Sequence, residues 1–161
     1  MSGIIGEVGS KSGVIGVFPS LEVSAFRGSL SSSVAVNYDT YAVIAMNDEA
    51  FDIDNSYDMT TGRFTAKKAG KYFAQGQLQI NVINTTQFAG IMIKKNGANQ
   101  DGAYRPSVSS SGSNTSTPSC STIFSLEIGD YLELFGGASF TSATTYGDAS
   151  LLATFFSIIK I

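Results

Sequence analysis

The chain has 161 residues, which suits a single domain with its own hydrophobic core. Only 14% of its residues are charged, against the usual ~25%, and its net charge of −3 at pH 7 argues against a nucleic-acid-binding surface. The sequence contains no histidine and a single cysteine, which excludes a Ser-His-Asp triad, a histidine-ligated metal and an internal disulfide.

Residues 1–24 differ from the rest of the chain, because glycines alternate with β-branched residues and no helical period is present. We interpret this segment as an extended arm that is too short and too rich in glycine to form a core of its own. The start lacks the pattern of a signal peptide, and no run approaches 18 apolar residues, so we expect cytoplasmic synthesis and no membrane association. The apolar side chains with which the arm would hold a partner are Ile4, Ile5, Val8, Val14 and Ile15.

From Ala25 onward the sequence predicts short β-strands and turns, since no segment sustains a 3.6-residue period. Residues 89–95 meet Asn96-Gly97, the strongest short hairpin signal, because both central residues of a type I′ turn need a positive φ. The runs with strand character before this hairpin are residues 34–36, 41–46, 63–65, 71–74 and 77–82.

Residues 105–119 are rich in Ser, Thr and Gly and contain two prolines, which predicts a long surface loop or a loosely held edge. Such a loop could form a recognition surface, although a plain solvated loop is the competing interpretation. The sheet resumes at 122–126 and 131–135. The apolar end, 151–161, predicts a strand in the middle of a sheet or against another subunit, because a free edge this apolar would aggregate. The candidate recognition residues are Tyr104, Arg105, Ser107 and Asn114.

Five carboxylates within residues 48–58 suggest a calcium site, because hard cations prefer several oxygen ligands. The weak candidate ligands are Asp52, Asp54 and Asp58, but the sixth and twelfth positions of an EF-hand loop starting at Asp52 hold Tyr57 and Arg63. We therefore favour a solvated strand-turn edge in which Asp58 holds the turn, and we expect no required cofactor.

Cys120 has no nearby histidine or basic residue to lower the pKa of its thiol, so we interpret it as a small buried side chain. No set of residues suited to catalysis remains, and we expect a protein that is not an enzyme.

Several segments, taken in order, resemble the globular head of complement's first component, subcomponent q, which belongs to the tumour-necrosis-factor-like jelly rolls. The most recognisable is 57–65, in which Tyr-Asp is followed by Thr-Gly and then Phe-Thr. The others are 25–26, 70–73, 95–97, 126–130 and 155–159. The resemblance covers about residues 25–161 and implies a ten-stranded jelly roll that forms a homotrimer. Its implied core and trimer-packing residues are Phe26, Tyr57, Phe64, Tyr72, Phe73, Phe155, Phe156 and Ile158.

We therefore predict an all-β antiparallel jelly-roll sandwich of about ten strands, with an arm over 1–24 and a head over 25–161. The N-terminus also resembles that of short bacteriophage structural proteins that carry a variable C-terminal head. This favours a virion protein whose arm anchors a trimeric knob to the major capsid protein or another virion protein, as a decoration or cement protein. A tail-fibre tip or adhesin that binds a host surface glycan or receptor, and a secreted lectin-like module, stay open as alternatives.

Overall fold

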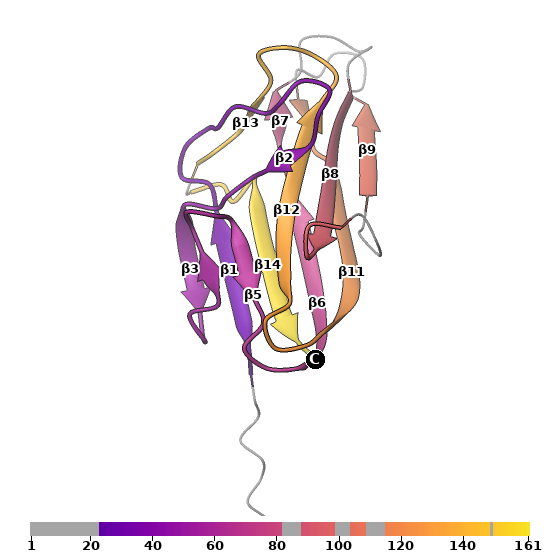
Figure 1. Ribbon diagram of the computed structural model, residues 1–161. Coiled ribbons are helices and arrows are strands. Elements are labelled where there is room, and N and C mark those ends of the chain that lie inside the picture. The colour runs from indigo at the N-terminus through magenta and orange to yellow at the C-terminus, as the bar shows by residue number, and fades with distance from the viewer. Residues whose placement is uncertain (1–22, 82–87, 99–103, 109–114, 149) are drawn as a thin grey trace, which may run out of the picture.

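A computed structural model describes residues 23–81, 88–98, 104–108, 115–148 and 150–161 of the chain. These residues form fourteen strands, several of only two residues, and no helix (Figure 1). The strands are β1 (Ala25–Ser29), β2 (Ala42–Val43), β3 (Asp48–Asp52), β4 (Tyr57–Asp58), β5 (Arg63–Thr65), β6 (Gly70–Gln77), β7 (Ile80–Asn81), β8 (Phe88–Lys95), β9 (Tyr104–Val108), β10 (Thr115–Ser116), β11 (Ser119–Leu126), β12 (Tyr131–Ala138), β13 (Thr144–Thr145) and β14 (Phe155–Lys160).

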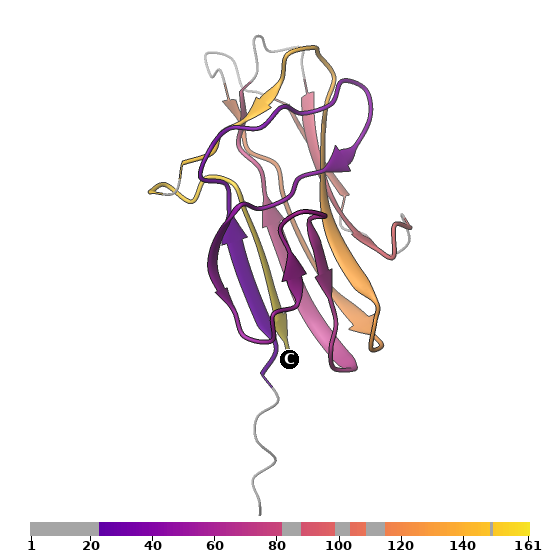
Figure 2. The ribbon, with the colours of Figure 1, turned by 60° about the vertical axis from the view of Figure 1, so that its left-hand side comes forward.

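Two sheets pack face to face, and every pairing between named strands is antiparallel (Figures 1 and 2). The five-stranded sheet has the order β11-β6-β14-β1-β3. The six-stranded sheet has the order β4-β5-β12-β8-β9, with β2 paired to β12. A small sheet, β10-β7-β13, lies at one end. The sandwich is the all-β, jelly-roll-like architecture that the sequence predicts.

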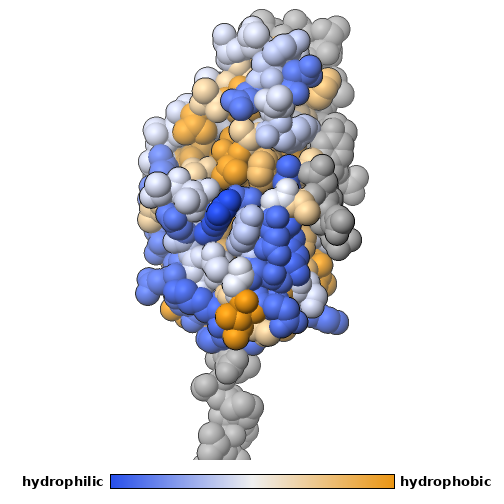
Figure 3. Space-filling model, in the orientation of Figure 1, coloured by the Kyte–Doolittle hydropathy of each residue, from blue (hydrophilic) through white to orange (hydrophobic). Residues whose placement is uncertain are grey.

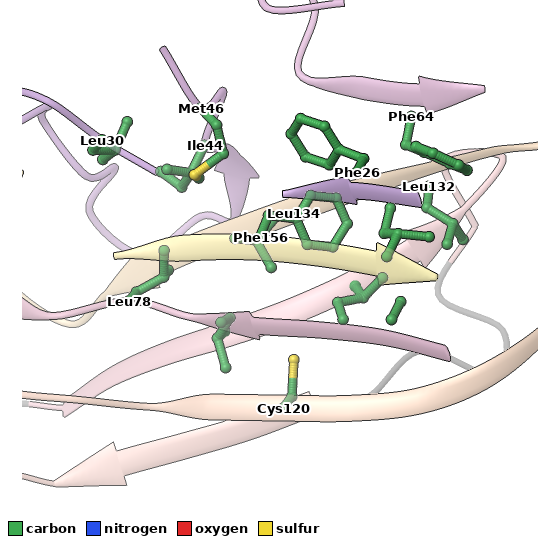
Figure 4. Packing of buried hydrophobic residues seen from close by; sticks show 14 of the residues in the cluster. Phe26, Leu30, Ile44, Met46, Phe64, Leu78, Cys120, Leu132, Leu134 and Phe156 are labelled. Atoms are coloured by element: carbon green, nitrogen blue, oxygen red, sulfur yellow. The ribbon is translucent and has the colours of Figure 1, made fainter. Parts of the chain in front are cut away.

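Aromatic rings from both sheets meet in the core between them (Figure 4). The rings of Phe26 and Tyr57 stack with centroids 4.0 Å apart, and Phe156 meets Phe26 edge-on at 6.3 Å. The Tyr57 hydroxyl accepts a hydrogen bond from the Met46 backbone N–H at 2.8 Å, and burial raises the pKa of Tyr57 to about 12. A Cβ at Gly76 would overlap the Leu134 side chain, so glycine is what allows the sheets to approach here.

The C-terminal strand occupies the position that its apolar sequence predicts. β14 lies in the five-stranded sheet between β6 and β1, with Phe156 and Ile158 turned into the core. Because β14 pairs with a strand on each side, it has no free edge that could promote aggregation. The strand begins only at Phe155, because residues 151–154 form a turn and bend before it.

Of the two predictions for 105–119, the described residues support an edge and contradict a loop, because they contribute to β9 and β11, which are edge strands of the two sheets. β9 pairs with β8 along its whole length, and β11 begins at Ser119 and pairs with β6. Ser and Thr are acceptable strand residues when neighbouring strands supply hydrogen bonds, and Pro106 is tolerated because β9 is an edge strand.

Other strand predictions are correct in type but wrong in length. The run 77–82 is interrupted at Leu78 and Gln79, and β7 contains only Ile80 and Asn81. The run 41–46 forms only the two-residue β2, and 34–36 contributes a single isolated bridge, between Ala35 and Thr144. Asn96 and Gly97 have φ of 51° and 71°, as the predicted hairpin turn requires.

One end of the sandwich, which we call the base, gathers the start of β1, the end of β14 and the turns at 53–56, 66–70 and 127–130 (Figure 2). Asp130 ties the 127–130 turn to the hairpin turn at Asn96-Gly97. Its carboxylate accepts hydrogen bonds from Lys95 Nζ at 2.7 Å, Asn96 Nδ2 at 2.7 Å and the Glu127 N–H at 2.9 Å. These three donors, Lys95 foremost, lower the pKa of Asp130 to about 2.

Candidate self-association surface

The outward face of the five-stranded sheet carries a row of apolar side chains across three adjacent strands. The antiparallel register sets Ile123 of β11 opposite Phe73 of β6, and Phe73 opposite Ile159 of β14. Ile123 is 55% exposed, Ile159 is 45% exposed and Phe73 is half-buried. Residues directly opposite each other on paired strands point to the same face of the sheet. These three side chains therefore form a continuous apolar stripe across the three strands.

The neighbouring rows on this face are polar, and the row on one side of the stripe carries Lys71 opposite Ser125. Gln75 stands between Ser121 and Ser157 in the row on the other side, followed by a row in which Gln77 lies opposite Phe155. Such uncharged side chains can be buried against a partner without removing many charges from water, which suits the core of a protein interface.

Arg27 of β1 is a charged side chain on the same face, in the row of Ser157 and Gln75. Its Cζ atom lies 5.5 Å from the centroid of the Phe155 ring, at a distance suited to a cation–π contact. The guanidinium group is thus held against the sheet instead of projecting from it.

The predicted core and trimer-packing residues divide into two groups. Phe73 and Phe155 are half-buried on the outward face, where a partner could contact them. Sequence reasoning missed Ile123 and Ile159 as exposed members of the same face. The pairs Ile123-Phe124 and Ile158-Ile159 were the signal, because one of two adjacent apolar residues on a strand points outward, but the strand pairing must be known to say which one. The other six residues are buried inside the monomer: Phe26, Tyr57, Phe64, Tyr72, Phe156 and Ile158.

The outward face of the six-stranded sheet is built differently. Glu133 of β12 lies between Arg63 of β5 and Lys94 of β8 in the register, and Arg63 Nε donates to Glu133 Oε1 at 2.9 Å. Among the described residues Glu133 is the only charged one that is fully buried, and its carboxylate raises the pKa of Arg63. The cations also cover aromatic rings, with Arg63 4.4 Å from the Tyr131 centroid and Lys94 4.1 Å from that of Phe135.

Each of the three weak calcium candidates is held by partners of its own. Asp52 accepts a hydrogen bond from the Tyr57 N–H at 2.7 Å. The Ser24 hydroxyl and the Lys68 ammonium lower the pKa of Asp54, and Lys68 Nζ lies 3.3 Å from its carboxylate. Asp58 accepts from the Thr61 hydroxyl and the Thr60 N–H, which lower its pKa and hold the turn. Within the described residues no three acidic or cysteine side chains converge as a metal site would require.

The remaining predicted sites lie in three places. Cys120 is buried, as predicted. Tyr104, Arg105 and Ser107 belong to strand β9 instead of a loop, while Asn114 and the arm residues Ile4, Ile5, Val8, Val14 and Ile15 lie outside the described residues. The described part of the chain holds no helix long and apolar enough to cross a membrane.

The paired antiparallel sheets, with the C-terminal strand at the centre of the five-stranded sheet, define a jelly-roll head of the tumour-necrosis-factor type. The model of the C1q domain family matches residues 25–157, and the chain belongs to this family. Domains of this family are generally non-enzymatic and typically form homotrimers.

Solved structures share the fold at low sequence identity. The globular domain of zebrafish complement 1qA is 16% identical with a TM-score of 0.55, covering 84% of this chain and 93% of that one. Murine APRIL at pH 8.5 is 11% identical with a TM-score of 0.61, covering 87% of this chain and 100% of that one. A search of the curated proteins found no similar sequence.

Proposed function

We propose that the protein is a non-enzymatic structural component of a bacteriophage particle, a homotrimeric knob anchored to the capsid by its N-terminal arm. The outward face of the five-stranded sheet carries the first half of this proposal. Its apolar stripe of Ile123, Phe73 and Ile159 would be covered by neighbouring copies of the head. A subunit interface of this kind buries well over ~1,200 Å² and excludes water from such residues.

The anchoring role rests on the arm, residues 1–24. Its apolar side chains and glycines are suited to lying extended across another protein, and its sequence resembles that of short phage structural proteins with a variable head. A knob with threefold symmetry would fit a threefold position on a capsid, because matched symmetry lets all three arms make the same contact. We therefore favour a capsid decoration or cement protein.

Electron microscopy of virus particles labelled with a gold-conjugated antibody against the head tests where the protein is located. Label spread over the shell is the expected result. Label confined to tail or fibre ends would overturn the decoration role and support a receptor-binding adhesin instead. Particles without any label, in a lysate that contains the protein, would overturn a virion role altogether.

Deletion of residues 1–16 tests the anchor. The shortened chain should still form a trimer, since the head begins at Ala25, but should no longer bind particles. The outcome that contradicts the anchor is full particle binding by the shortened chain, measured by co-sedimentation beside the full-length protein.

A further inference from the structure

Four aliphatic side chains are exposed together at the base, the end at which the arm joins the head. Val23, Ile53, Ile128 and Ile161 are between 40% and 72% exposed. Backbone hydrogen bonds join the segments that carry them, since the Ile53 N–H donates to the Ala25 carbonyl and the Ile161 N–H to the Lys71 carbonyl. We call these four residues the base patch. Figure 3 shows hydrophobic groups set among hydrophilic ones at this lower end.

The fold does not require an aliphatic residue at Ile128, the most exposed member of the base patch. Ile128 is the second residue of the 127–130 turn, in which the Asp130 N–H donates to the Glu127 carbonyl and Gly129 supplies a φ of 92°. The glycine is what this turn needs, whereas the second position accepts most polar residues. An isoleucine at a solvent-exposed turn contributes little to the stability of the head alone, so its side chain is available for an external contact.

Lysines outnumber carboxylates at the same end, although two of them are ion-paired: Lys68 lies 3.3 Å from Asp54 and Lys95 lies 2.7 Å from Asp130. Lys67, Lys68 and Lys71 belong to or flank the 66–70 turn, and Lys95 and Lys160 lie close to it. Lys67 donates to the backbone carbonyls of Asp54 and Asn55, which do not neutralise its charge.

The far end of the head has the opposite character. The segments 30–47 and 138–152 contain Asp39 and Asp148 but no lysine or arginine. The head is thus electrically polarised along its long axis even though the whole chain is acidic. A partner surface of negative charge would favour approach by the base and disfavour approach by the far end.

We propose that the base patch and its lysines form a second contact with the protein surface to which the arm is anchored, and that this surface is acidic. The inference rests on the proposed function. The arm joins the head at Val23, so a partner that the arm grips is tethered to this end of the head. Tethering makes the second contact effectively intramolecular, so even a weak contact strengthens attachment.

The test compares two matched double variants of the full-length chain. Ile53→Thr with Ile128→Thr removes apolar surface from the base. Tyr38→Thr with Leu151→Thr removes comparably exposed apolar surface away from the base. Each purified protein is added to particles assembled without it, and binding is measured by co-sedimentation across a range of concentrations.

We expect the base variant to bind at least about tenfold more weakly than the unaltered chain, from the lost apolar burial, and the control variant to bind normally. Equal binding by both variants would overturn the inference while leaving the anchored knob intact. No binding by the unaltered chain would remove the proposed function itself, and the inference with it.

Two further measurements keep the inference testable if the base variant folds poorly. Binding of the unaltered chain should weaken as salt rises from about 50 to 500 mM, because the lysines face an acidic surface. Lys67→Glu should weaken it as well, since this exposed side chain of the base turn then repels that surface. If neither raised salt nor the lysine substitution weakened particle binding, the acidic character of the partner surface would be excluded. Salt-sensitive binding to anionic lipid vesicles, with none to particles, would replace the protein surface by a membrane.

Discussion

The outward faces of the two sheets differ in how many of their side chains find interaction partners within one copy of the chain. On the six-stranded sheet the buried Glu133 carboxylate accepts from Arg63, and the cations of Arg63 and Lys94 lie over aromatic rings. On the five-stranded sheet, Ile123 and Ile159 project into solvent beside Phe73.

This difference favours the five-stranded sheet as the side of the sandwich that associates with a partner. Charged groups that already have partners lose hydration without gain when a second protein covers them, whereas apolar groups gain free energy from the same burial. Two faces with equal strand pairing can therefore have opposite tendencies to associate. The comparison predicts that substitutions on the five-stranded sheet change assembly, and those on the six-stranded sheet change the stability of the head.

The largest effect is expected from placing charge on the apolar stripe. Phe73→Lys with Ile159→Lys would bury two unpaired cations on each subunit, and the trimer should dissociate to monomers, with association weakened by more than about a thousandfold. Sedimentation equilibrium measures the mass. Phe88→Lys, an exposed aromatic on the six-stranded sheet, is the matched control and should remain trimeric. A trimeric double variant would contradict the assignment of the stripe to the interface.

The next effect concerns the core that both faces share. Tyr57→Phe keeps the ring stacked on Phe26 but removes the hydroxyl that accepts from the Met46 N–H. That buried N–H then lacks its partner, at a cost of about 1–3 kcal/mol in the free energy of unfolding. Chemical denaturation of a monomeric background measures the change, and an unchanged midpoint would show that the hydroxyl does not stabilise the head.

A smaller effect is expected from a substitution on the outward face of the six-stranded sheet. Glu133→Ala removes the acceptor of the Arg63 guanidinium, which is half-exposed and can regain water, so the melting temperature should fall by only a few degrees. The trimer mass should stay unchanged. Dissociation of this variant at ordinary concentrations would contradict the prediction that the six-stranded face affects stability and not assembly.

The smallest effect appears at low pH, at the base. The pKa of Asp130 is lowered to about 2, so its ionised form contributes stability above the unfolded pKa near ~4, and this contribution is lost as the pH falls towards 2. Asp130→Asn should flatten the stability curve between about pH 4 and pH 2. Melting curves across this range measure it, and parallel curves for both proteins would exclude Asp130 as the source.

The sequence determined the fold class and the local turns of this protein. The absence of a 3.6-residue period, the Asn96-Gly97 pair and the apolar C-terminal strand each depend on neighbours along the chain, and all three predictions are confirmed. The short motifs, taken in their order along the chain, also pointed to the family whose model matches residues 25–157. Local preferences suffice for such features because turn geometry and side-chain alternation act over a few residues.

Only the tertiary structure decided which residues face outward and which neighbours they meet. Residues 104–108 and 119–121 become strands because β8 and β6 pair with them, a long-range effect that their Ser-rich, Pro-containing sequence does not encode. Ile123, Phe73 and Ile159 form one stripe because the register aligns three strands that are distant in the chain. Strand pairing sets this register through contacts across the whole fold, so the surface it creates could not be derived from any single segment.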